Sequence, residues 1–326
     1  MTTHKEPLSS VLDTVGETPL VAVHTGPSSV DVYAKLESFN PGGSVKDRIG
    51  EYMLERMLER GDIDPGGTVI EPTAGNTGIG FAIAAKQLGL EAICVVPERF
   101  SREKQQLMRA LGAEVVNTPT EAEIAGAVER AHELAAEIDN SVVPQQFSNP
   151  LNAEAHYETT GPEIYEALDG EVGAVVAGCG TAGTLMGIGR YAREQHPDTH
   201  VCAVEPEGSV YTRFFGAETD HEEYKTEGIG TSDPATNELF EPELVDDVLQ
   251  VSDRAAQAEL KRLAREEGHL VGSSAGAASA ATQRVAERIS DGQLSVPHPT
   301  VVTVFPDTSE RYLSKGIYEA FAAWEG

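Results

Sequence analysis

The stretch TVIEPTAGNTGIGFAIAAKQLGLEAICVV, residues 68–96, has the pattern of a strand, a loop, a helix and a second strand. β-branched and apolar residues predict strands over Thr68–Glu71 and Glu91–Val96. Helical spacing of apolar residues predicts a helix over Thr77–Leu88, which the loop Thr73–Asn76 joins to the first strand. Two strands joined by a helix run parallel in one sheet, so the sequence predicts an α/β fold.

The same alternation continues on both sides of this stretch and predicts mostly parallel, twisted sheets with helices on both faces. At about 150 residues per domain, the 326 residues correspond to about two domains, with a division near Phe147–Ala153. Further helices are expected over Arg48–Leu58, Arg102–Leu111, Glu121–Ile138 and Thr184–Gln195, and further strands over Ala113–Asn117, Ala174–Ala177, His200–Val204 and Thr300–Phe305.

The charge balance is strongly acidic, because 53 Asp and Glu residues face only 24 Lys and Arg residues, for a net charge of −29. This charge repels nucleic acids and anionic membrane surfaces, so neither is expected as a partner. The acidic residues are spread over the whole chain and lysines are few, as in proteins of salt-loving organisms. An ordinary acidic protein is the alternative.

The chain has an odd number of cysteines, Cys94, Cys179 and Cys202, and no two of them form a C-x-x-C pair. The nine histidines do not show the spacing of metal ligands. Neither a disulfide scaffold nor a metal site is therefore expected. The polar start predicts no secretory signal. Val172–Gly189 carries no charge, but its six glycines favour a strand, a loop and a helix start over a membrane span. The expected location is the cytoplasm.

The segment Asn40-Pro-Gly-Gly-Ser-Val-Lys46-Asp-Arg48 places a lysine just after a tight turn. Ser44 is expected to cap the following helix, with Lys46 in its first turn. The positive end of the helix dipole would lower the lysine pKa, as a nucleophilic amine requires. A surface lysine beside Asp47 is the alternative.

The run Pro-Gly-Gly-Ser-Val-Lys-Asp-Arg, residues 41–48, resembles the cofactor-lysine loop of pyridoxal-phosphate (PLP) enzymes of fold type II. In particular, the chain resembles the cysteine synthase and cystathionine β-synthase family, whose fold is like that of the tryptophan synthase β subunit. This resemblance extends from Gly16-Glu-Thr-Pro-Leu20 to Tyr312-Leu-Ser314. The resemblance implies that Lys46 forms the Schiff base with PLP and later acts as the general base.

The loop Glu71–Gly78 brings hydroxyls, an amide and backbone N–H groups to a helix N-terminus, which favours an anion site. A simple N-cap loop is the alternative. The loop is similar to the family's asparagine loop, in which Ala74 stands where serine is common, so one hydroxyl is lost. The resemblance implies that Asn76 contacts PLP and that the substrate carboxylate is bound by Thr73, Ala74, Gly75 and Thr77.

Two more segments look like parts of the family's substrate site. In Gln145-Gln146-Phe-Ser-Asn-Pro150 the resemblance favours Gln146 over Gln145 as a further carboxylate ligand, although a polar interdomain loop is the alternative. Glu227-Gly-Ile-Gly230 is similar to the short glycine loop beside the active site, which adds Gly228 to the substrate-binding residues.

Gly178-Cys-Gly-Thr-Ala-Gly183 satisfies G-x-G-x-x-G between a strand and a helix, and Glu205 lies 22 residues beyond it. This pattern allows a dinucleotide site and a nicotinamide-dependent dehydrogenase. The segment also resembles the family's phosphate loop Gly-Thr-Gly-Gly-Thr, and Lys46 favours that interpretation. Ala182 replaces a glycine and would be strained if φ is positive there. The implied phosphate ligands are Gly180, Thr181, Ala182, Gly183 and Thr184.

Gly272-Ser273-Ser274-Ala-Gly276 opens a helix and resembles the loop whose serine bonds the pyridine nitrogen of PLP. The glycine at 276 selects Ser274 over Ser273, while two helix-capping serines are the alternative. A neutral serine, unlike an aspartate, limits carbanion character and favours β-elimination over transamination and racemisation.

The resemblance implies two α/β domains with PLP in the cleft between them: a smaller one at 41–150, and a larger one formed by 1–40 and 151–326. A homodimer is the family habit. The expected reaction is β-replacement that makes L-cysteine from O-acetylserine and sulfide. The alternatives are serine with homocysteine, or O-phosphoserine as donor, with Arg213 either as the partner of its phosphate or as a surface arginine. A dehydrogenase and a catalytically inactive binding partner are more remote alternatives.

Overall fold

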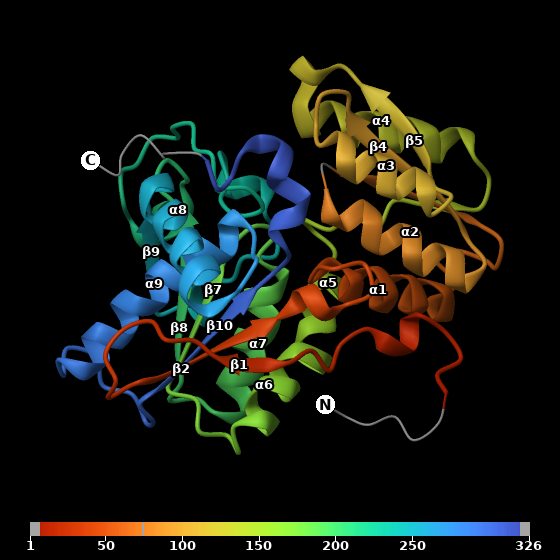
Figure 1. Ribbon diagram of the computed structural model, residues 1–326. Coiled ribbons are helices and arrows are strands. Elements are labelled where there is room, and N and C mark those ends of the chain that lie inside the picture. The colour runs from red at the N-terminus through yellow and green to blue at the C-terminus, as the bar shows by residue number, and fades with distance from the viewer. Residues whose placement is uncertain (1–6, 74, 320–326) are drawn as a thin grey trace. The chain divides into compact units, whose positions relative to one another are not determined.

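The computed structural model describes residues 7–73 and 75–319, and it divides into two compact units (Figure 1). The first unit takes the residues up to Glu17 and Phe39–Ala155, and the second takes Thr18–Ser38 and the residues from His156 onward. Residues 7–17, expected with the larger domain, belong to the first unit because Leu12 is part of its core and Ser10 Oγ donates to Gln87 Oε1 at 3.0 Å.

The first unit is built on a sheet in which neighbouring strands run parallel, in the order β5-β4-β3-β6 among the described residues. Helix α4 covers one face, where Ala131 and Leu134 pack against Ile70 and Val95. Helices α1, α2 and α3 lie on the other. The elements are α1 (Lys46–Arg60), β3 (Thr68–Pro72), α2 (Asn76–Leu88), β4 (Glu91–Pro97), α3 (Arg102–Ala110), β5 (Glu114–Thr118), α4 (Glu123–Glu137), β6 (Ser141–Val142) and α5 (Leu151–Ala155).

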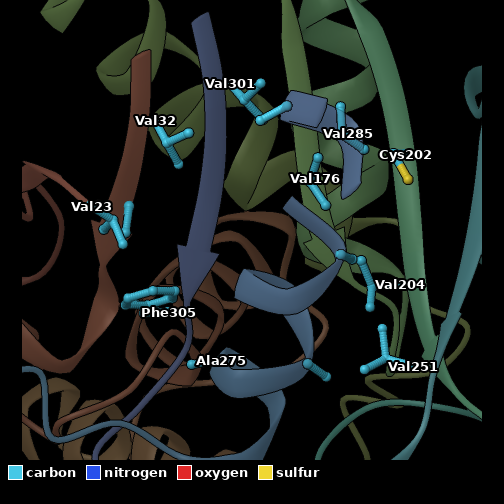
Figure 2. Packing of buried hydrophobic residues seen from close by; sticks show 14 of the residues in the cluster. Val23, Val32, Val176, Cys202, Val204, Val251, Ala275, Val285, Val301 and Phe305 are labelled. Atoms are coloured by element: carbon cyan, nitrogen blue, oxygen red, sulfur yellow. The ribbon is translucent and has the colours of Figure 1, made fainter. Parts of the chain in front are cut away.

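The second unit contains a sheet of order β1-β2-β10-β7-β8-β9 among the described residues, parallel except for the β1–β2 pair. Helices α8 and α9 pack on the face that carries Val176, Val204 and Val301 (Figure 2). The elements are β1 (Leu20–Ala22), β2 (Asp31–Leu36), α6 (Gly161–Ala167), β7 (Ala174–Gly178), α7 (Gly183–Gln195), β8 (His200–Pro206), β9 (Asp247–Val251), α8 (Asp253–Arg262), α9 (Ser273–Ser290) and β10 (Thr300–Phe305).

These two sheets with their flanking helices confirm the predicted α/β class, and each strand predicted from the sequence is present within about two residues. Gly89 and Gly61 end their helices with positive φ, as expected of C-terminal glycines. Cys94, Cys179 and Cys202 are buried and free. No helix in residues 7–73 and 75–319 is long and apolar enough to cross a membrane.

Candidate active site

Lys46 is the first residue of α1 and is half-buried. The N-cap residue is Val45 rather than the expected Ser44, whose hydroxyl nevertheless accepts from the Lys46 N–H at 3.3 Å. The preceding turn is held by the Asp47 carboxylate, which accepts from the Gly42 N–H at 2.6 Å. A Cβ on Gly42 would lie 2.4 Å from Asp47 Oδ1, so a side chain there would displace the carboxylate that holds the turn. The lysine therefore leaves a rigid turn at the positive end of a helix.

Helix α2 lies directly beside α1, and the contact is made by two glycines (Figure 1). A Cβ on Gly50 would lie 2.5 Å from the carbonyl of Gly80, and a Cβ on Gly80 would lie 2.4 Å from the carbonyl oxygen of Lys46. Such distances are impossible for real side chains, so the two helix backbones touch. Because Lys46 opens α1 and Asn76 opens α2, this contact fixes both predicted PLP ligands within one unit.

The predicted carboxylate loop is closed by Thr73, whose buried hydroxyl accepts from the N–H groups of Gly75 at 3.1 Å and Gly78 at 3.3 Å. Thr77 Oγ1 donates to Gln146 Oε1 at 2.7 Å. The structure thus brings Thr73, Gly75, Thr77 and Gln146 together. Ala74 lies outside the described residues.

Gln146 and not Gln145 faces this loop, because Gln146 is buried and Gln145 is exposed. Asn152 Nδ2 holds the Gln146 backbone carbonyl at 2.7 Å. Two residues without a predicted role also belong to this region. Burial raises the pKa of Glu71 well above its ordinary value, an effect that the neighbouring Gln146 side chain partly offsets. Lys104 is buried, and a Cβ on Gly75 would lie 3.3 Å from its Nζ.

The predicted phosphate loop follows β7 and opens α7 in the second unit. The Gly180 carbonyl of this loop accepts from both Tyr211 Oη and Asn237 Nδ2, at 2.7 and 2.8 Å. A Cβ on Gly180 would lie 2.3 Å from the Gly228 carbonyl oxygen, so the two predicted glycine loops touch. The N–H groups of the first helical turn have no acceptor within the helix. With the hydroxyls of Thr181 and Thr184, they form a donor set that fits a phosphate dianion.

Ala182 has φ 67° and ψ −22°, in the left-handed region. The condition stated from the sequence, a positive φ at this position, is therefore met, and the backbone explains the family glycine. The alanine is 3% exposed and holds this conformation at a cost of roughly 1–2 kcal/mol.

Glu205, the residue that a dinucleotide site would direct to a ribose, is fully buried. Its carboxylate accepts from the N–H of Tyr211 at 2.7 Å, from the N–H of Thr212 at 3.2 Å and from Gln250 Nε2 at 3.1 Å. Glu205 therefore stabilises the segment that carries Tyr211, and through Tyr211 the phosphate loop. The Glu205 carboxylate is already used by these hydrogen bonds, which argues against a role in binding a ribose and against a dehydrogenase.

The two serines at the start of α9 have different surroundings. Ser273 Oγ accepts from the Glu227 N–H at 3.0 Å and so binds the Glu227–Gly230 loop to the helix. Ser274 is 5% exposed, and its hydroxyl has no hydrogen-bond partner among residues 7–73 and 75–319. Ser274 thus offers a hydroxyl at the start of α9 that suits the pyridine nitrogen, so the donor sets of both ends fit PLP.

The Pyridoxal-phosphate dependent enzyme family model matches residues 11–307. The chain is 43% identical to an O-acetylserine dependent cystathionine beta-synthase of Bacillus subtilis over 96% of this chain and 98% of the relative. It is equally similar, at 43%, to a cysteine synthase of Helicobacter pylori over 95% of this chain and 99% of the relative.

Solved structures agree with these relatives. The crystal structure of an O-acetylserine dependent cystathionine beta-synthase from Helicobacter pylori has a TM-score of 0.85 at 42% identity, covering 96% of this chain and 99% of the other. That of a cysteine synthase from Entamoeba histolytica has a TM-score of 0.90 at 32% identity, covering 98% and 93%. The match spans nearly all of the chain, which therefore belongs to the pyridoxal-phosphate dependent enzyme family.

Proposed function

We propose that this protein is a cysteine synthase that replaces the acetoxy group of O-acetylserine with sulfide to make L-cysteine. The observation that carries the proposal is the 43% identity, over almost the full length, to a relative named cysteine synthase. A second relative at 43% is named for its dependence on O-acetylserine, which supports the same donor.

PLP, when bound, supplies an electron sink for the charge that develops at the substrate Cα. Lys46 would hold it covalently, Asn76 and Ser274 would contact its ring, and the phosphate would lie in the cup at 180–184. This assignment is supported by the rigid turn before Lys46, the open hydroxyl of Ser274 and the donor set of α7.

Lys46 would move the proton at the substrate Cα. It stands at the N-terminus of α1, where the partial positive charge of the helix opposes a cation, and this position suits an amine that acts as general base. Removal of the Cα proton lets acetate leave from Cβ, and sulfide then adds at Cβ. Return of the proton from Lys46 to Cα completes the exchange, so no further base is needed.

The substrate carboxylate would be bound by the loop at 73–77 and by Gln146, with Gly228 beside it. Thr73 and Thr77 keep this loop closed through their bonds to Gly75, Gly78 and Gln146. These contacts would hold the loop in place to orient the amino acid with its Cα–H toward Lys46.

A second nucleophile, homocysteine, is favoured by one specific observation: the relative named O-acetylserine dependent cystathionine beta-synthase. O-phosphoserine has less support, because Arg213 Nε donates to the Thr219 carbonyl at 2.7 Å and its guanidinium lies 3.9 Å from Asp220. The test is a steady-state assay that offers acetylserine, phosphoserine or serine, each with sulfide or homocysteine. We expect turnover with acetylserine, and turnover confined to serine or phosphoserine would overturn the proposal.

We further propose a cytoplasmic homodimer adapted to high salt. The support for salt adaptation is the net charge of −29, whose repulsion is screened as the Debye length falls from about 30 Å at 0.01 M to about 3 Å at 1 M salt. The melting temperature should rise between these two conditions, and a flat response would contradict the adaptation. Light scattering tests the dimer.

A further inference from the structure

His156 is a fully buried histidine that the mechanism above does not use. It begins a π-helical turn, His156–Thr160, which packs against α7 in the second unit. π-Helical turns are rare in proteins, and those that occur are often found at functional sites. Both ring nitrogens face hydroxyls: Nε2 lies 3.1 Å from Thr184 Oγ1, and Nδ1 lies 2.8 Å from Thr160 Oγ1.

The chemistry of phosphate decides the direction of these hydrogen bonds. Phosphate oxygens of a dianion only accept, so a Thr184 hydroxyl that binds phosphate must donate its single hydrogen to it. The Thr184 oxygen must then accept from His156 Nε2–H. In the neutral imidazole Nδ1 carries no hydrogen, and it accepts from the Thr160 hydroxyl. All three hydrogens thus point from Thr160 through His156 and Thr184 toward the phosphate.

We propose that His156 is a positioning residue that directs the Thr184 hydroxyl to donate to the phosphate of PLP. The proposal rests on the proposed function, because it takes the cup at 180–184 as the phosphate site. His156 does not itself touch the cofactor. Without it, Thr184 would be free to turn its hydrogen elsewhere, and the cup would lose one oriented donor.

The test compares two ligands that differ only in the phosphate, PLP and pyridoxal. Apo-protein is prepared from the wild type and from His156→Phe, and the Kd of each ligand is measured by absorbance titration. We expect His156→Phe to weaken PLP about tenfold or more, as for the loss of one hydrogen bond to a charged group, and to leave pyridoxal unchanged. His156→Gln keeps an N–H donor and should recover most of the PLP affinity.

Thr184→Val supplies the matched comparison, because it removes the donor itself. It should weaken PLP as much as His156→Phe, and the double variant should add little, since both act on one hydrogen bond. Thr160→Val, a smaller change at the far end, should give a partial loss and keeps the test open if His156→Phe fails to fold.

Three results would overturn the proposal: an equal loss of PLP and pyridoxal in His156→Phe, no loss of either, or full additivity of the His156 and Thr184 variants. In those cases the wild type would still bind PLP and use O-acetylserine, so the proposed function would stand. A wild-type protein that binds neither ligand would overturn both.

Discussion

The carbonyl oxygen of Lys46 lies against Gly80, so closely that a Cβ on Gly80 would be 2.4 Å from it. The residue that we assign to the cofactor is thus positioned by a glycine 34 positions later, on the helix that Asn76 opens. Any side chain at 80 must separate α1 from α2 and move Lys46.

We therefore predict that Gly80→Ala lowers cysteine formation by about tenfold to a hundredfold, because a displacement of about 1 Å at a catalytic group costs up to that much. The melting temperature should also fall, since the overpacked contact costs about 1–3 kcal/mol. Gly189→Ala is the matched control: it lies within α7, and its nearest neighbours would be at 3.7 Å, an ordinary contact. Equal activity of the two variants would contradict the close contact.

Ala182 yields a prediction about strain. A glycine there would relieve roughly 1–2 kcal/mol of left-handed strain, but it would lose about 0.5–1 kcal/mol of backbone entropy and about 0.8 kcal/mol for the buried methyl group. Ala182→Gly should therefore leave the free energy of unfolding nearly unchanged, as measured with urea. Ala182→Val should be clearly destabilising, because a β-branched residue is a severe outlier at φ 67°. A valine tolerated as well as glycine would refute this account.

Glu51 on α1 should make stability depend on pH. Burial, with the neighbouring carboxylates of Glu55 and Asp13, raises its pKa to about 7, against the opposing effect of Arg48. A raised pKa means that the folded state binds the proton more tightly than the unfolded state does. The contribution of protonated Glu51 to the free energy of unfolding is therefore fully present below about pH 4.5 and lost as pH rises through 7. Glu51→Gln should remove that loss, with melting temperatures of variant and wild type diverging between pH 5 and about 8.

The control for this prediction is Glu129→Gln, which makes the same change of charge at an exposed position. Because Glu51 is only half-buried, solvent and salt screen its interactions, and the divergence should shrink in 1 M salt. A Glu129 variant that matches the Glu51 variant at every pH would assign the effect to net charge alone.

Ser274 should decide the type of reaction. Ser274→Asp would place an anion beside the ring nitrogen and raise the pKa of that nitrogen. A protonated ring would stabilise the negative charge from the substrate Cα so strongly that the leaving group is expelled more slowly. Cysteine formation should slow by at least about tenfold, which corresponds to about 1.4 kcal/mol of activation free energy. Ser273→Asp is the control and should matter less, because Ser273 already accepts from the Glu227 N–H. The reverse order of effects would mean that Ser273 is the ring partner.

Local pattern was enough for the strands and loops that carry the site, because their periodicity and turn residues lie within short windows. Strand β2 was missed because Lys35 interrupts its apolar pattern. This lysine is buried, and its charge is paired with Glu163 at 2.6 Å. His156 gave no sequence signal, because its role depends on Thr184, 28 positions away. The contact of Gly180 with Gly228 is equally non-local.

The family resemblance supplied roles that spacing alone left open, such as Ser274 over Ser273. The structure adds a physical reason for that choice in the bond from Glu227 to Ser273. It also gives the φ of Ala182, whose sign the sequence left open.

The most direct test of the account is the formation of cysteine from O-acetylserine and sulfide by the purified holoenzyme, measured beside Lys46→Ala. We predict that the wild type releases cysteine and acetate in equal amounts. Lys46→Ala should keep the fold and lose turnover by several orders of magnitude, because both the covalent link and the base are removed. A PLP-loaded wild type that makes no cysteine, or a Lys46→Ala variant that retains the wild-type rate, would contradict the account.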